Sequence, residues 1–141
     1  MYRIGRLILT VELVLGVFLS FLLDWSGNHL LHPAWHPHAR FHGALLLFFL
    51  AGASAIALWL LWRKSLEPHV AIDVATLITV AFWTPLFYVT SVLPGSTAWA
   101  GPQGAEPHLG SMVFLPNMAV ALLFLASAIL ARFLSRRVPL F

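Results

Sequence analysis

The chain of 141 residues is 60% hydrophobic and only 9% charged, with a mean hydropathy of +0.89. Soluble domains carry about 25% charged residues, so this composition excludes an ordinary soluble protein and indicates one membrane-embedded domain over residues 1–141. The pI of about 10.2 does not indicate nucleic-acid binding, because the basic residues flank apolar segments. The lack of cysteine excludes disulfides, thiolate metal sites and a cysteine nucleophile.

Four apolar stretches predict four membrane-spanning helices. Each stretch is long enough to cross a hydrocarbon core, which requires roughly 20 helical residues. They cover approximately residues 7–27, 42–62, 72–93 and 112–131. The predicted fold class is therefore all-α, an integral membrane four-helix bundle with two irregular outer loops. Arg3 and Arg6 before the first stretch would suit a signal peptide, but Asp24-Trp25 follows it in place of a small-residue cleavage site.

The basic residues predict the orientation of this bundle. Seven of the eight fall on one side of it, namely Arg3, Arg6, Arg63, Lys64, Arg132, Arg136 and Arg137. The positive-inside rule makes that side the cytoplasm, so we expect both termini inside the cell. The histidine-rich loops would then face the extracytoplasmic side of a bacterial inner membrane.

The first outer loop concentrates the titratable groups of the chain. Five histidines lie within the fourteen residues from His29 to His42. Asp24, Asn28 and His32 recur at intervals of four, so a helix that continued as far as His32 would align them in one polar stripe. A carboxylate beside an imidazole fixes its tautomer and raises its basicity, which predicts an Asp–His catalytic pair. The alternative is ordinary capping at the membrane interface.

A metal site is a second interpretation of the same loop. His38 and His42 are four residues apart, and on the first turn of a helix both imidazoles would point the same way, as in many helical metal sites. Further candidate ligands are His29, His32, His36 and His108. Imidazole ligands without thiolate suit a divalent metal such as zinc or iron. The alternative is a hydrogen-bonded polar cap without metal.

Other polar and aromatic residues complete the predicted outer site. Tyr88 and Glu106 are the candidate partner acids. Arg40 breaks the positive-inside pattern, so it either pairs with a carboxylate, Asp24 or Glu106, or holds the polar head group of a ligand. The candidate substrate-binding residues are Asn28, Arg40, Asn117, Trp35 and Trp83.

Glu12 is a carboxylate well inside the first span. A charged group at that depth is costly and normally faces the bundle interior or a wet cavity. Gly16 and Ser20 follow at intervals of four on the same helix face. Glu12 is predicted either to be an acid–base or cation-binding group, or to be a structural carboxyl hydrogen bonded to another helix.

The loop from Asn28-His29 through Pro33-Ala34-Trp35-His36-Pro37-His38-Ala39-Arg40-Phe41-His42 resembles a signature of small uncharacterised four-helix bacterial membrane proteins. A broader likeness, of architecture and chemistry, is to sterol isomerases of the emopamil-binding-protein type. Those enzymes build a lipid-accessible pocket in a small helical bundle, where His and Glu handle protons. The likeness implies a lipophilic substrate and transfers no individual residue.

The leading hypothesis is a small membrane enzyme that acts on a lipophilic substrate from the bilayer. His and Asp groups at the outer end would perform isomerisation, cyclisation or hydration, with Asp24 orienting His32 or His38. The alternatives are a metal-binding or metal-dependent protein, and a non-catalytic subunit that docks a partner through the outer loops. The expected partners are the bilayer and a lipophilic small molecule, and no nucleic acid is expected. A homo-oligomer is a further alternative.

Overall fold

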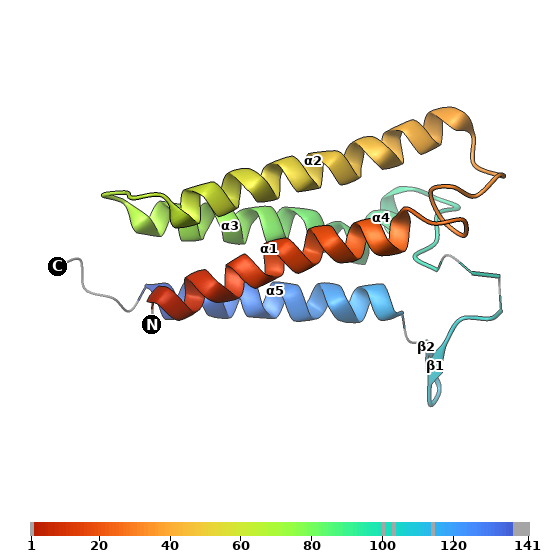
Figure 1. Ribbon diagram of the computed structural model, residues 1–141. Coiled ribbons are helices and arrows are strands. Elements are labelled where there is room, and N and C mark those ends of the chain that lie inside the picture. The colour runs from red at the N-terminus through yellow and green to blue at the C-terminus, as the bar shows by residue number, and fades with distance from the viewer. Residues whose placement is uncertain (1, 100, 103, 114, 137–141) are drawn as a thin grey trace.

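The computed structural model describes residues 2–99, 101–102, 104–113 and 115–136. Within these residues, four helices are long and apolar enough to cross a membrane. They are α1 (Tyr2–Asp24), α2 (Pro37–Trp62), α3 (Pro68–Trp83), which the 3-10 turn η1 (Thr84–Phe87) extends, and α5 (Pro116–Ser135) (Figure 1). The predicted all-α four-helix membrane bundle is confirmed.

The helix boundaries differ from the predicted ones, and prolines account for most of the difference. Pro37, Pro68 and Pro116 each occupy the start of a helix, where the missing N–H costs nothing. α2 and α3 therefore start several residues earlier than the apolar stretches do. α5 starts later than predicted, because Met112 and Val113 form a short strand instead.

That strand belongs to a hairpin in the second outer loop, which we expected to be irregular throughout. β1 (His108–Leu109) pairs antiparallel with β2 (Met112–Val113), with His108 opposite Val113. Gly110 has a φ of 65° between the strands, a conformation that glycine adopts without steric cost. A four-residue helix, α4 (Val89–Val92), precedes this loop.

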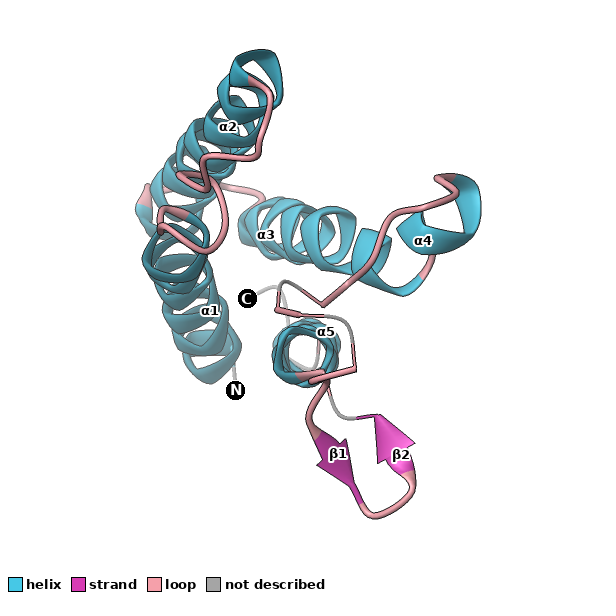
Figure 2. Ribbon diagram, turned by 90° about the vertical axis from the view of Figure 1, so that its right-hand side faces the viewer, coloured by secondary structure: helices cyan, strands magenta, loops and turns pink. Residues whose placement is uncertain are grey.

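The bundle has two chemically different ends. The start of α1 and the end of α5 lie together at one end, called here the terminal end (Figure 1). The loop after α1 and the loop between α4 and α5 lie at the opposite end, the loop end. Seen along the helices, α1 and α2 form one side, while α3 and α5 lie beside each other opposite them (Figure 2).

The tightest packing lies in the terminal half of the bundle. Its buried cluster consists mostly of small and branched side chains, namely Leu9, Leu13, Ala57, Leu61, Ala71, Ile72, Ala75, Ala128 and Ala131. Small residues let helices approach closely where lipid supplies no hydrophobic drive. The large apolar side chains face outward instead, as Phe49 does with 71% of its surface exposed. This outward apolar surface fits a lipid environment.

The closest approach of α1 to α5 depends on Gly5. A Cβ atom at Gly5 would lie 2.5 Å from the carbonyl oxygen of Ala131. We expect Gly5→Leu to force the helices apart and to destabilise the protein by about 1–3 kcal/mol, the usual cost of overpacking. Thermal unfolding in detergent, followed by circular dichroism, measures the change.

The matched control is Gly52→Leu. A Cβ atom there meets nothing within 4 Å, and the change in helix propensity is the same. Equal loss of stability in both variants would contradict the close contact at Gly5.

Candidate functional site

The predicted stripe on an extended first helix is wrong. α1 ends at Asp24. The Ser26 hydroxyl donates to the Leu23 carbonyl at 2.7 Å, so this side chain takes an acceptor that a continued helix would use for a backbone N–H. The Leu30 N–H donates a hydrogen bond to the Asp24 carbonyl at 3.0 Å, and residues 26–31 form turns. Asp24 therefore lies beside His29, with 3.8 Å between Oδ1 and Nε2, in place of His32.

Two loop histidines are engaged by the local backbone. The Nδ1 atom of His32 accepts the N–H of Ala34, and that of His36 accepts the N–H of His38 where α2 begins, both at 3.2 Å. Each of these rings therefore has one nitrogen occupied in a turn or cap. This is the capping role that the sequence left open as an alternative.

His38 and His42 do converge as their spacing predicts. Their Nε2 atoms are 3.0 Å apart, and both side chains are exposed on the first turns of α2. His108 lies on the β hairpin, on the side of the bundle away from α2 in both views (Figures 1 and 2). Among the described residues, no three His, Asp or Glu side chains are grouped closely enough to hold one ion. The larger predicted ligand set is thus not assembled.

The remaining residues of the predicted outer site make separate local contacts. Arg40 donates through Nη2 to the His32 carbonyl at 2.8 Å, and the described residues give it no carboxylate partner. Trp35 packs edge-on against His29, with ring centres 5.1 Å apart. Asn117 Nδ2 donates to the Ala98 carbonyl at 3.0 Å. These contacts order the outer loops.

Two further predicted residues, Tyr88 and Glu106, have no side-chain hydrogen-bond partner among the described residues. The Asn28 side-chain amide lies 2.6 Å from the Ser26 hydroxyl, whereas Tyr88, half exposed, and Glu106 make no side-chain hydrogen bond to any described residue. They lie in the segments on either side of α4, away from His38 and His42 on α2. Among its described residues, the loop end therefore shows a histidine pair and local loop contacts, without an enclosed acid–base site.

Glu12 lies in a different setting, at the centre of the bundle. Only 5% of its surface is exposed, and its Oε1 atom is hydrogen bonded to the hydroxyl of Ser127 on α5. The Ser127 oxygen also lies 2.7 Å from the carbonyl oxygen of Leu123 in its own helix. The Ser127 hydroxyl therefore lies between the Glu12 carboxyl and the backbone of its own helix, and it links that carboxyl to α5.

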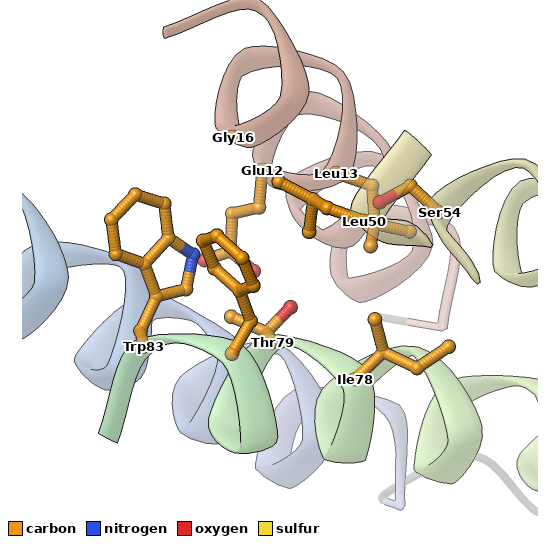
Figure 3. Close-up of a pocket in the computed structure, with 9 residues that line it drawn as sticks. Glu12, Leu13, Gly16, Leu50, Ser54, Ile78, Thr79 and Trp83 are labelled. Carbon is orange, nitrogen blue, oxygen red and sulfur yellow. The ribbon is translucent and has the colours of Figure 1, made fainter. Parts of the chain in front are cut away.

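A small polar cavity adjoins this carboxyl group. Its volume is about 10 Å³, roughly the space of one water molecule. Glu12, Ser54 and Thr79 give it polar walls, and Figure 3 shows the indole nitrogen of Trp83 on the same side as the Glu12 carboxyl. Glu12 Oε2 and Ser54 Oγ are buried without a hydrogen-bond partner in the described chain. The cavity therefore holds free hydrogen-bonding capacity within an apolar bundle.

An apolar groove of about 440 Å³ lies next to this cavity, between α2 and α3. Leu50, Ile78 and Phe82 line both spaces, so these three side chains form the partition between them. On the surface of the bundle the groove is bounded by exposed apolar residues, Leu46, Phe49 and Leu77. A molecule dissolved in the lipid can therefore reach the groove without crossing water.

The sequence identified Glu12 and Trp83 but not the residues that surround them. Ser54, Thr79 and Ser127 each interrupt an apolar span, which is the signal that could have drawn attention to them. Their relation to Glu12 depends on how three other helices are rotated about their axes, and the sequence alone does not fix those rotations.

The Ser127 contact can be tested by stability. Ser127→Ala leaves the buried carboxyl of Glu12 without its hydroxyl partner, and we expect a loss of about 1–3 kcal/mol in the free energy of unfolding. Ser54→Ala removes a hydroxyl that has no partner, so its effect should be near zero. Thermal unfolding in detergent compares the two variants. A larger loss for Ser54→Ala would contradict this assignment.

Over residues 8–139 the sequence matches the family of unknown function DUF6640, and the chain belongs to that family. The search of curated proteins and the search of solved structures both gave no match. The family description names no activity, so the site itself has to carry the functional argument.

Proposed function

We propose that this protein is a small integral membrane enzyme that performs acid–base chemistry on a lipophilic substrate taken from the bilayer, with Glu12 as the proton-transferring group. One observation carries the proposal. A buried carboxyl with an unpartnered oxygen lies behind a three-residue partition from an apolar groove that faces lipid. The sequence hypothesis of such an enzyme is kept, and its reacting group moves from the histidines to Glu12.

The groove favours a lipophilic substrate. Its volume of about 440 Å³ falls within the roughly 300–1,000 Å³ of small-molecule sites, and the residues lining it are apolar. Polar groups, those of Glu12, Ser54 and Thr79, line the adjoining cavity behind Leu50, Ile78 and Phe82. A suitable substrate is therefore a hydrocarbon body with one reactive or polar centre, and Phe82 must rotate to let that centre meet Glu12.

The chemistry follows from a carboxyl group that is buried within an apolar bundle. A carboxylic acid kept neutral by apolar surroundings can donate a proton to a carbon–carbon double bond, and the resulting carboxylate can accept one back from a neighbouring carbon. Such a double-bond shift needs no oxidant, reductant or second substrate. Hydration and cyclisation begin with the same protonation. The Trp83 indole and the hydroxyls of Ser54 and Thr79 are available to orient the reacting centre.

Distance separates this chemistry from the loop histidines. Glu12 and Asp24 are twelve residues apart on α1, which corresponds to about 18 Å along a helix. An imidazole at the loop end therefore cannot exchange a proton with the atom that Glu12 contacts. Within the proposed orientation, the loop end faces the extracytoplasmic side of a bacterial inner membrane, supported by the basic residues of the terminal end.

Solvent deuterium provides a test that does not require the substrate to be known. Purified protein in lipid nanodiscs is incubated in D2O with the total lipid extract of the source membrane, and the lipids are analysed by liquid chromatography and mass spectrometry. We expect the wild type to place deuterium on carbon in one lipid class, or to convert it to an isomer or hydrate. Glu12→Gln should reduce this by about 10²-fold or more, because the amide cannot transfer the proton.

Glu67→Gln is the control, because it makes the same chemical change at an exposed residue just before α3. It should retain full activity. Deuterium incorporation that survives in Glu12→Gln would refute the role of Glu12. Absence of any change in the wild type across the extract would refute the enzyme itself.

The convergence of His38 and His42 favours a second candidate function, metal binding at the loop end. Their Nε2 atoms lie 3.0 Å apart, and a metal at about 2.0–2.1 Å from each would subtend an angle of about 95°. Water or a bound ligand would supply the other positions.

Elemental analysis of the untagged protein tests the metal site. We expect one iron or zinc per chain after reconstitution, and none in the His38→Ala/His42→Ala double variant. His108→Ala, which removes a histidine on the separate hairpin, should keep its metal. Equal metal content in all three proteins would show that the pair is not a ligand set.

A further inference from the structure

A second groove, at the terminal end of the bundle, has the chemistry of a lipid headgroup site. It lies between α3 and α5 and has a volume of about 400 Å³. Arg132 and Arg136 line it at the end of α5, whereas Leu77, Val80 and Ile129 line the part nearer the bundle centre. We infer that this groove binds an anionic phospholipid, with its phosphate on the two arginines and its acyl chain along the apolar wall.

The two arginines present an unbalanced positive charge. Arg132 lies in the last turn of α5, and Arg136, four residues later, is its C-cap with helical backbone angles, so the two project from the same face. Arg132 Nε is 2.6 Å from Asp73 Oδ1, which neutralises one charge and leaves the terminal nitrogens of Arg132 available. Arg136 is exposed and has no side-chain partner within the described ranges. Two guanidinium groups and one carboxylate leave a net charge of +1, the complement of a singly charged phosphodiester.

Thr76 supplies an independent indication of a ligand. Only 4% of its surface is exposed, its side chain lines the groove, and its hydroxyl has no hydrogen-bond partner among the described residues. A buried hydroxyl normally has a partner. A phosphate or ester oxygen in the groove would give the Thr76 hydroxyl an acceptor that the protein does not provide.

The position of the groove selects a lipid over a soluble anion. Its apolar part runs along α3 and α5 toward the bundle centre, which is the direction of an acyl chain whose headgroup lies at the interface. The terminal end also carries Arg3, Arg6, Arg63 and Lys64, so it suits the leaflet that is rich in anionic lipid. Neither arginine belongs to the Glu12 cavity, so the site is separate from the proposed reaction.

Native mass spectrometry of the full-length protein in detergent tests the inference. Phosphatidylglycerol and phosphatidylcholine of equal chain length are titrated separately, and inorganic phosphate is added as a competitor in a third series. We expect one phosphatidylglycerol to be retained well above phosphatidylcholine. Arg136→Gln should weaken its binding about five-fold, the effect expected of one basic residue at an anionic surface. Thr76→Val, which replaces the hydroxyl by a methyl group, should also weaken it.

Arg3→Gln is the matched control, because it removes an exposed charge from the same end of the bundle. It should weaken phosphatidylglycerol binding much less than Arg136→Gln does, because Arg3 does not line the groove. The inference is overturned if phosphatidylcholine binds equally well, or if Arg3→Gln weakens binding as much as Arg136→Gln does. Displacement of the lipid by inorganic phosphate at comparable concentration would show a soluble-anion site and overturn the lipid assignment.

Discussion

The burial of the Glu12 carboxyl group constrains the rest of the bundle. Lipid offers no hydrogen-bond partner, so this group must be satisfied by other helices. The contact with Ser127 fixes the rotation of α1 against α5, and that rotation also turns Gly5 toward α5 and Gly16 toward Trp83. Gly5 permits the close approach of α1 to α5, because a Cβ atom there would lie 2.5 Å from the Ala131 carbonyl oxygen. The close packing at Gly5 and the hydrogen bond at Glu12 thus depend on the same rotation of α1.

The helices could be predicted because their signal is continuous. Each span is a run of apolar residues of the length that a bilayer requires, and its chemistry does not depend on its neighbours. The loop after α1 could not be predicted in the same way. Ser26 and Asp24 use local hydrogen bonds to stop the helix, and a four-residue repeat in the sequence cannot show that these bonds win over helical ones.

The site was predictable only in part, for a related reason. Glu12 stands out because a carboxylate in a span is rare, and Trp83 is among the candidate substrate-binding residues. The proximity of Ser54 and Ser127 to Glu12 depends on the contacts between helices, so the sequence does not predict it. The groove beside them lies between α2 and α3, and the sequence pattern does not predict the space between two helices.

The uneven distribution of buried residues along α2 has a consequence for motion. Its first buried residue is Leu47, ten residues after the helix begins, while Ala57 and Leu61 belong to the tight cluster near its other end. Opening free energies within one protein range from near zero to the full unfolding value, according to such local packing. By this measure the outer third of α2 opens more easily than the part in the cluster. It is held by the end of α1 and the loop after it, where Phe48 packs edge-on against Phe21 and Trp25 and Gly43 lies against Leu30. The groove wall that Leu46 and Phe49 supply beside Glu12 therefore depends on the packing of the first outer loop against α2.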